Sequence, residues 1–223
     1  MTAEEAAFRA VAKRPGVYRV SAFFARQLAR VYFRLGTRGS ENIPALGPVI
    51  LASNHVSFLD PPLIGAFLPR KIHFLARKTL FDSPLLGWLI RQLQAVPVDR
   101  DGGGGAGLKA ILDRLDGGAG ILLFPEGTRS PDGEVKAARA GIGMTVIKSS
   151  APVIPVRIFG AFEAWGRHQK FPRSHRIRIV FGRPLHFEKL RAEAETCDKA
   201  RLKEIYQEIA DQLMDAIRGL TQD

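Results

Sequence analysis

His55 and Asp60 are the first residues along the chain whose types and spacing could do chemistry. A histidine at the end of a strand can act as a general base, bind a metal or serve as a polar loop residue. A carboxylate that accepts a hydrogen bond from one ring nitrogen would fix the tautomer and leave the other nitrogen to take a proton. Residues five apart on a straight helix point about 140° away from each other, so this contact requires a bend in the chain. Asp-Pro-Pro at 60–62 supplies it, because proline disfavours helix at the residue before it.

Asp60 has an alternative use. We expect a helix over 60–68 with Asp60 at its N-cap and Pro61 in its first turn. Capping alone and orienting His55 are both compatible with the spacing, and one carboxylate can do both.

A second cluster, FPEGTRS at 124–130, combines an acid, a glycine, a hydroxyl and an arginine: Glu126, Gly127, Thr128 and Arg129. The guanidinium of Arg129 matches phosphate or carboxylate, and Gly127 lets the backbone approach a ligand closely. The alternative is a surface turn in which Glu126 pairs with Arg129. A third cluster, Arg77 and Lys78, adds two cations at the end of another strand.

Short apolar runs alternate with helical patterns along most of the chain. Strands are predicted at 48–53, 71–77, 95–100, 120 onward into the 124–130 turn, 151–160 and 176–182, and helices at 60–68, 83–93, 108–115, 139–149 and 198–220, with a glycine-rich connection at 102–107. This alternation predicts an α/β fold with a mostly parallel central sheet flanked by helices. Since ligands bind beyond the carboxyl ends of such strands, His55, Arg77 and Glu126 should share one edge. The prolines at 152 and 155 predict an edge strand, or one reshaped for a ligand.

The segment 18–36 reads as an amphipathic helix ending at Gly36. An apolar stripe runs along it, with a row of arginines beside it: Val20, Phe24, Leu28, Val31 and Leu35, widened by Phe23, and Arg26, Arg30 and Arg34. Such a helix suits a bilayer interface. The alternative is a helix packed on the domain with its arginines in water.

Charge and composition limit the partners. The 223 residues carry a formal net charge of +11, which predicts a partner with phosphates, either nucleic acid or an anionic membrane. The basic stretch 165–178 suits nucleic acid, a phosphorylated cofactor or a lipid surface equally. The single cysteine, Cys197, excludes an intramolecular disulfide and a cysteine cluster for zinc. Because no apolar run is long enough to span a bilayer and no signal peptide is recognisable, we expect a cytoplasmic protein, soluble or lying on a membrane.

NHVSFLD at 54–60 resembles the N-H-x4-D signature of the glycerolipid acyltransferases of the 1-acylglycerol-3-phosphate acyltransferase type. The stretches 71–81, 124–130 and 153–156 resemble the family's second, third and fourth blocks, in family order, and the resemblance covers roughly residues 36–185. It implies the glycerolipid acyltransferase fold over 37–223, with residues 1–36 as an amphipathic membrane-surface anchor.

The resemblance also implies roles. His55 would be the general base and Asp60 its orienter in transfer of an acyl group from acyl-CoA or acyl-carrier protein to the hydroxyl of a lysophosphatidic acid-like acceptor. Neither cofactor nor metal is implied. The acceptor would be held by the 126–129 turn, with Arg129 on its phosphate, and Arg77 and Lys78 would add positive charge. One departure is that Arg139-Ala140-Gly141 stands where many members have Phe-Lys-x-Gly.

The expected partners are therefore a lipid acceptor, an acyl thioester, an anionic membrane surface and, as one form of the donor, acyl-carrier protein. The expected location is the cytoplasmic face of the membrane, as a peripheral or monotopic protein. The alternatives are an acyltransferase acting on another lyso-lipid or an aminolipid, a lipid-binding protein without catalysis, and a nucleic-acid-binding module. The last leaves the His/Asp and FPEGTRS clusters unexplained, so nucleic acid is not an expected partner.

Overall fold

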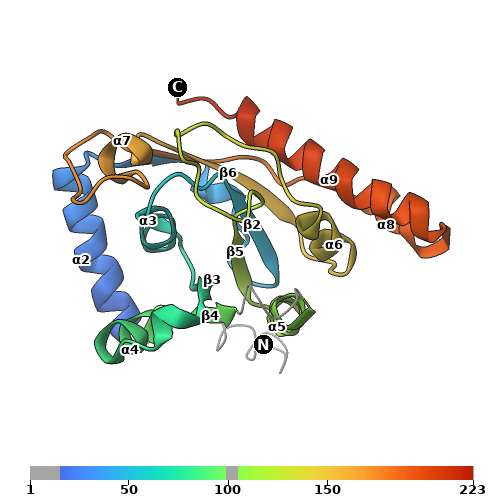
Figure 1. Cartoon of the computed structure of the whole chain (residues 1–223), viewed down its shortest axis with the longest axis horizontal. Coiled ribbons are helices and arrows are strands. Elements are labelled where there is room, and N and C mark those ends of the chain that lie inside the picture. The colour runs from blue at the N-terminus through green and yellow to red at the C-terminus, as the bar shows by residue number, and fades with distance from the viewer. Residues whose placement is uncertain (1–15, 99–104, 223) are drawn as a thin grey trace.

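The computed structural model describes residues 16–98 and 105–222, in which a central sheet has helices on both faces (Figure 1). Its strands are β1 (Gly36–Arg38), β2 (Val49–Ser53), β3 (Ile72–Arg77), β4 (Ala95–Val98), β5 (Gly120–Leu123), β6 (Val153–Phe159) and β7 (Arg178–Phe181). They lie in the order β1-β7-β6-β2-β5-β3-β4. Every neighbouring pair is parallel except β6 and β7. The predicted α/β fold with a mostly parallel sheet is confirmed.

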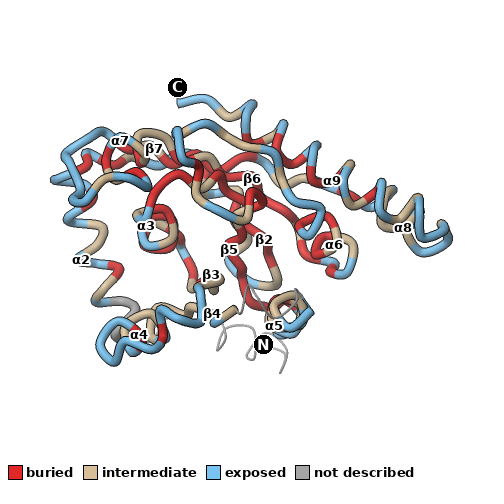
Figure 2. The backbone as a smooth tube through the Cα atoms, viewed as in Figure 1, coloured by how far each residue is buried: buried red, intermediate tan, exposed pale blue. Residues whose placement is uncertain are grey.

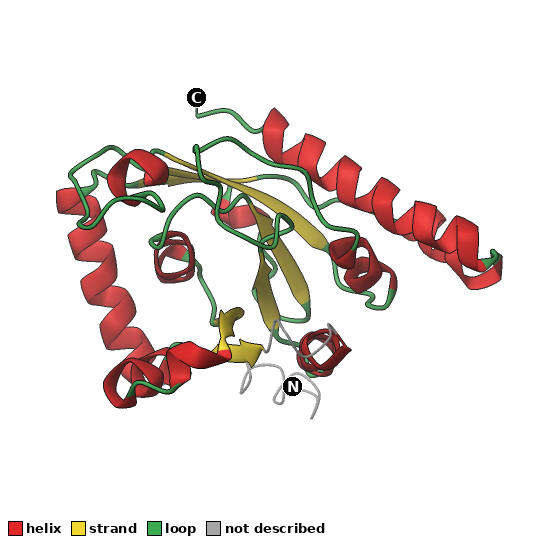
Figure 3. Ribbon diagram, viewed as in Figure 1, coloured by secondary structure: helices red, strands yellow, loops and turns green. Residues whose placement is uncertain are grey.

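The helices form two layers (Figure 3). They are α2 (Gly16–Tyr32), α3 (Asp60–Phe67), α4 (Pro84–Gln92), α5 (Gly105–Asp116), α6 (Gly141–Ile147), α7 (Ala161–Trp165), α8 (Glu188–Thr196) and α9 (Lys199–Gly219), with 3-10 turns η1 (Ser40–Asn42) and η2 (Lys78–Phe81). One core cluster joins the sheet to α2 and α3, and another joins it to α5, α6 and α9. Because apolar layers cover both faces, all five residues of β2 are buried, and a continuous apolar run is what the sequence shows there.

Helix α2 ends at Tyr32, so the predicted end at Gly36 was wrong. Arg34 takes a left-handed conformation (φ 45°), and the N–H of Leu35 donates to the carbonyl of Ala29 at 3.0 Å, so the chain turns back on the last turn of the helix. Gly36 instead opens β1, opposite Arg178 of β7. Periodicity could not show this, because Leu35 continues the apolar spacing but is buried in the core.

The residues of the predicted apolar stripe that lie on α2 are exposed, and exposed residues are pale blue in Figure 2. The helix packs on α3 through small side chains, with Ala22 and Ala29 buried. The exposed fractions of the stripe are Val20 57%, Phe23 53%, Phe24 66%, Leu28 60% and Val31 81%. The helix is therefore packed on the domain and presents its larger apolar side chains to the outside, and its contact with a bilayer stays a prediction.

The remaining predictions about strands and helices differ in their outcome. Strand β6 pairs with β2 and β7, so the edge-strand interpretation of its prolines was wrong. Residues 102–104 of the glycine-rich connection lie outside the described residues, and α5 already begins at Gly105. The strand β1 and the helices α7 and α8 were not predicted. Within residues 16–98 and 105–222, no helix has the length and apolar character needed to cross a bilayer. The division at residue 36 stays a prediction.

Candidate active site

The polar clusters gather at one edge of the sheet. His55 follows β2, Glu126 follows β5 and Arg77 ends β3, and these three strands are parallel neighbours in the sheet. The predicted meeting of the clusters at the carboxyl ends of the strands is thus confirmed.

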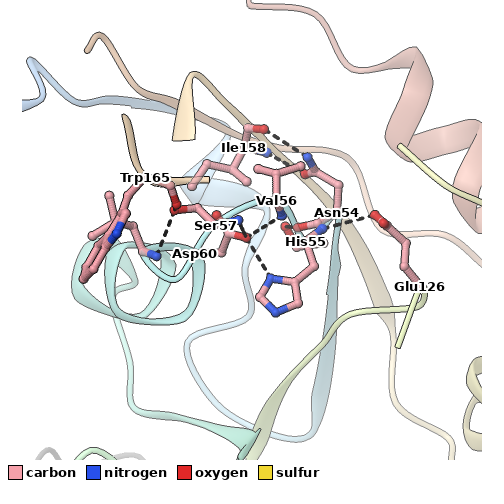
Figure 4. Close-up of polar contacts among 10 residues, drawn as sticks. Asn54, His55, Val56, Ser57, Asp60, Glu126, Ile158 and Trp165 are labelled. Atoms are coloured by element: carbon pink, nitrogen blue, oxygen red, sulfur yellow. Dashed lines mark hydrogen bonds and ion pairs between the residues drawn. The ribbon is translucent and has the colours of Figure 1, made fainter. Parts of the chain in front are cut away.

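Asp60 lies against His55 (Figure 4). Its Oδ2 is 2.8 Å from Nδ1 of His55, and it also accepts the N–H groups of Val56 (2.7 Å) and Ser57 (2.8 Å). The chain between the two residues therefore curls around the carboxyl group, which is buried. The predicted N-cap was wrong: α3 begins at Asp60, its N-cap is Leu59, and the carboxyl group serves the turn before the helix.

The turn 124–130 holds the backbone of His55 from two sides. The N–H of His55 donates to Oε1 of Glu126 (3.1 Å), and its carbonyl accepts the N–H of Ser130 (2.7 Å). The ring of Phe124 stacks on the imidazole, with centroids 3.9 Å apart. Neither the stacking nor the double backbone contact is visible in the sequence, because each joins the ends of different strands.

Glu126 is 4% exposed, so the interpretation of this turn as a surface pair was wrong. Burial raises the pKa of its carboxyl group to about 7, although the hydrogen bond from the His55 N–H opposes the rise. Its Oε2 is buried without a hydrogen-bond partner among the described residues. Glu126 therefore supports His55 through the backbone, with a carboxyl group that can hold a proton near neutral pH.

Arg129 lies on an aromatic platform. Its guanidinium carbon is 3.5 Å from the centroid of the Phe58 ring, and that ring packs on Trp165 at 5.4 Å. An arginine stacked on an aromatic face loses little of its hydrogen-bonding capacity, because its donors lie in the plane of the guanidinium. Phe58 belongs to the stretch between His55 and Asp60, so the same turn carries the histidine and supports the arginine.

A cavity of 1070 Å³ lies in front of His55. Five of the predicted site residues line it: His55, Arg77, Lys78, Gly127 and Thr128. Much of the remaining wall is apolar, including Leu75, Val98, Leu108, Ile111, Leu122, Phe124, Ile142 and Met144. Asp60 and Glu126 lie behind His55 and Arg129 lies over Phe58, and these three do not line the cavity.

Arg139, noted as a departure from the family pattern, also lines the cavity. Its side chain lies against Gly127: a Cβ on Gly127 would be 2.9 Å from Nε of Arg139. Gly127 also has a positive φ of 70°, so two observations explain glycine at this position. In the described part of the chain, no three His, Cys, Asp or Glu side chains gather as a set of metal ligands.

Asn54 joins the end of β2 to β6. Its side-chain amide accepts the N–H of Ile158 (2.8 Å) and donates to the carbonyl of Ile158 (3.1 Å). Ser57 is held by the carbonyl of Trp165, to which its Oγ donates at 2.7 Å. Sequence reasoning missed Asn54, Ser57, Phe58 and Phe124 as site residues. Their only signal was position within the NHVSFLD and FPEGTRS stretches.

An α/β sheet with a carboxyl-supported histidine at the carboxyl ends of its strands, facing a largely apolar cavity, places a group that can accept a proton where such sheets bind their ligands. The chain belongs to the acyltransferase family, since the sequence model described as Acyltransferase matches residues 34–159. The family resemblance carried by the four motifs is thereby confirmed.

Known relatives agree. The chain is 28% identical over 176 residues to the chloroplastic 1-acyl-sn-glycerol-3-phosphate acyltransferase LPAT1 of Arabidopsis thaliana, covering 77% of this chain and 48% of that protein. It is 28% identical over 147 residues to the 1-acyl-sn-glycerol-3-phosphate acyltransferase of Bacillus subtilis, covering 66% and 71%. The chain thus spans about half the length of the Arabidopsis relative. The crystal structure of the 1-acyl-sn-glycerophosphate (LPA) acyltransferase PlsC from Thermotoga maritima superposes with a TM-score of 0.70 at 25% identity, covering 92% of this chain and 81% of that one.

Proposed function

We propose that this protein is an O-acyltransferase that moves a fatty acyl group from acyl-CoA or acyl-carrier protein to the free hydroxyl of a lysophosphatidic acid-like acceptor in phospholipid biosynthesis. The observation that carries the proposal is the 2.8 Å contact between His55 and Asp60 beside an apolar cavity. The related enzymes of Arabidopsis thaliana and Bacillus subtilis are both named for a 1-acylglycerol-3-phosphate acceptor, which supports this choice of acceptor.

Asp60 sets the tautomer of His55. Its Oδ2 already accepts two backbone N–H groups, so its contact with the imidazole is best made by an N–H at Nδ1. Nε2 then carries the lone pair, and no residue of the described chain hydrogen-bonds to it. His55 is thereby prepared to accept a proton on the side of the cavity.

The reaction then needs one proton transfer and one substitution. Nε2 of His55 takes the proton from the acceptor hydroxyl as that oxygen attacks the thioester carbonyl carbon. The C–O bond of the new ester forms, the C–S bond breaks, and the departing thiolate receives the proton from the imidazolium. Neither a covalent acyl-enzyme nor a metal is required.

The lining of the cavity divides between the two substrates. The apolar wall suits a fatty acyl chain. For the acceptor, we assign the lining residues Gly127 and Thr128 to close backbone and hydroxyl contacts, and Arg77 and Lys78 to general positive charge at the rim. Arg129, which lies outside the lining and over Phe58, is assigned to the phosphate. Glu126, which the family resemblance placed with the acceptor, is better explained as a residue that positions His55, because it is buried and bonded to its N–H.

We place the protein on the cytoplasmic face of a membrane, as a peripheral or monotopic protein. The exposed apolar stripe of α2, with arginines beside it, supports this placement. Deleting residues 1–36 would not test it cleanly, because Phe33 and Leu35 belong to the core. Phe24→Ser with Leu28→Ser removes only exposed side chains, and we expect it to weaken binding to vesicles.

The deciding experiment crosses lyso-acceptors, including lysophosphatidic acid, lysophosphatidylcholine and a lyso-aminolipid, with acyl-CoA and acyl-carrier protein donors, followed by mass spectrometry of the products. We expect acylated lysophosphatidic acid, and a loss of at least about 100-fold for His55→Ala. The matched control is His186→Ala, since His186 also lies beside a carboxylate (Glu188, 3.3 Å) but is 70% exposed and outside the site. Near-normal turnover by folded His55→Ala would refute the mechanism. Product from another acceptor alone would replace the acceptor, and absence of thiol release from any donor would leave a lipid-binding protein.

A further inference from the structure

The segment 166–176, here called the basic loop, has a composition that the proposed chemistry does not use. Its sequence, GRHQKFPRSHR, holds four arginines and lysines and two histidines but no acidic residue. The cations are exposed, and so is the one aromatic residue of the loop, Phe171, at 78%. An exposed phenylalanine among exposed cations needs an explanation outside the core.

The charges of the basic loop are uncompensated. Among residues 16–98 and 105–222, no carboxylate pairs with the cations Arg167, Lys170, Arg173 and Arg176. By contrast, Arg201 on α9 contacts Glu193, Glu204 and Glu208. The positive charge of the basic loop is therefore available to an external anion.

The basic loop is held at both ends by elements already described. At its far end, the carbonyl of Pro172 accepts from the hydroxyl of Tyr32 (3.3 Å) and the Oγ of Ser174 donates to the carbonyl of Tyr32 (2.7 Å). Tyr32 is the last residue of α2, so the basic loop lies where the exposed stripe of that helix ends (Figures 1 and 2).

At its near end, the basic loop contacts the turn between His55 and Asp60. Gly166 forms a bridge with Ser57, and Ser57 lies between His55 and Asp60 in the chain. Gln169 folds back on the start of the loop, with its carbonyl accepting from Nε1 of Trp165 at 3.2 Å. The loop therefore connects the helix that faces outward with the turn that carries the histidine.

We propose that the basic loop is a contact site for an anionic bilayer surface. The loop continues the membrane contact made by α2 and holds the turn between His55 and Asp60 close to the membrane. The inference rests on the proposed function and adds a specific surface to it. Cations bind anionic headgroups, and a phenylalanine among them enters the interfacial layer. The apolar stripe of α2 favours a bilayer over a nucleic acid as the partner. Val31 and Leu28 can enter the apolar layer of a bilayer, whereas the phosphate backbone of a nucleic acid has no such layer.

The test compares two sets of charge removals in the full-length protein. Arg167→Gln/Lys170→Gln/Arg173→Gln removes three of the four cations of the basic loop. Lys189→Gln/Lys199→Gln/Lys203→Gln removes the same charge from exposed positions on α8 and α9, far from α2 in Figure 1. Co-sedimentation is measured with vesicles of phosphatidylcholine and with vesicles containing phosphatidylglycerol, at several salt concentrations and without acyl donor or acceptor.

We expect the loop variant to bind the anionic vesicles about 100-fold more weakly than the unchanged protein, since each cation near such a surface contributes about fivefold. The control variant should lose clearly less, and Phe171→Ser should weaken binding to both kinds of vesicle about 10-fold. Thermal melting checks that each variant is folded. We expect folded variants, because all the replaced side chains are exposed.

Equal losses for the loop and control variants would overturn the proposal, because net charge alone would then explain binding. So would equal weakening of vesicle binding and of binding to a DNA duplex, since the site would then be a general phosphate surface. The proposed function is tested separately, by acyl transfer with the unchanged protein in detergent. Loop-dependent vesicle binding without acyl transfer would refute the function and leave this inference standing.

Discussion

Replacing Glu126 with glutamine removes a titratable proton but keeps an oxygen that can accept the N–H of His55. Burial raises the pKa of Glu126 from 4.5 to about 7, so the folded protein binds this proton more tightly than the unfolded chain. Its contribution to stability is complete below pH 4.5 and is lost as the pH rises to about 7. The difference between these two values corresponds to about 3 kcal/mol at 1.36 kcal/mol per unit.

We therefore expect the free energy of unfolding of Glu126→Gln, relative to the unchanged protein, to rise by about 3 kcal/mol between pH 4.5 and 8. Chemical denaturation across this range measures it. The control is Glu195→Gln, which removes a carboxyl group from an exposed position on α8 and so measures the effect of losing one carboxylate outside the site.

Catalysis gives a second readout for Glu126. Because glutamine still accepts the His55 N–H, kcat/KM should stay within about fivefold of the unchanged value. Glu126→Ala leaves that N–H unpaired, which costs about 1–3 kcal/mol of folding stability and removes a hydrogen bond that positions His55, so we expect kcat to fall further than for glutamine. If glutamine instead lost as much as alanine and the loss lay in KM for the acceptor, the carboxylate would contact the acceptor and the positioning role would be refuted. An unchanged pH dependence of unfolding would show that Glu126 does not titrate as described.

Three further substitutions test other contacts of the site. Asp60→Asn should lower kcat about 10²–10⁴-fold while the protein stays folded, because a neutral amide replaces the carboxylate that orients His55. An unchanged kcat in a folded variant would exclude this role of Asp60. Phe58→Leu removes the ring under Arg129, so KM for a phosphorylated acceptor should rise about 2–30-fold with little change in kcat, and a loss confined to kcat would contradict the platform. Gly127→Ala places a Cβ against Arg139 at a positive φ, and we expect a lower melting temperature by calorimetry, from about 1–2 kcal/mol of backbone strain; an unchanged melting temperature would count against it.

Strands β2 to β7 could be predicted because buried strands leave uninterrupted apolar runs, as 48–53 does for β2, whereas the short strand β1 leaves no such run. The meeting of His55, Arg77 and Glu126 followed from the same topology. The contact of Asp60 with His55 was predicted as one of two alternatives, but its geometry was not, since the carboxyl group accepts N–H groups from the turn rather than from the helix.

What could not be predicted depends on contacts between distant parts of the chain. The end of α2 is fixed by the pairing of Gly36 with Arg178, which no local pattern shows. The outward direction of the apolar stripe depends on alanines that fit closely against α3, whereas periodicity identifies the stripe but not the face that is covered. The support of Arg129 by Phe58 likewise joins two motifs that are separate in the sequence.

Asn54 explains how the chain can leave a rigid sheet and still form a tight turn around a carboxyl group. Continued by three residues, to Val56, the parallel ladder of β2 and β6 would pair the N–H of Val56 with the carbonyl of Ile158. The amide of Asn54 occupies Ile158 instead, as donor and acceptor together, and so acts as a substitute peptide group. The N–H of Val56 is thereby released to Asp60. Asparagine beside the histidine thus exchanges one backbone hydrogen bond of the sheet for a hydrogen bond from Val56 to the Asp60 carboxylate, an exchange that aspartate, which lacks the donor, could not make.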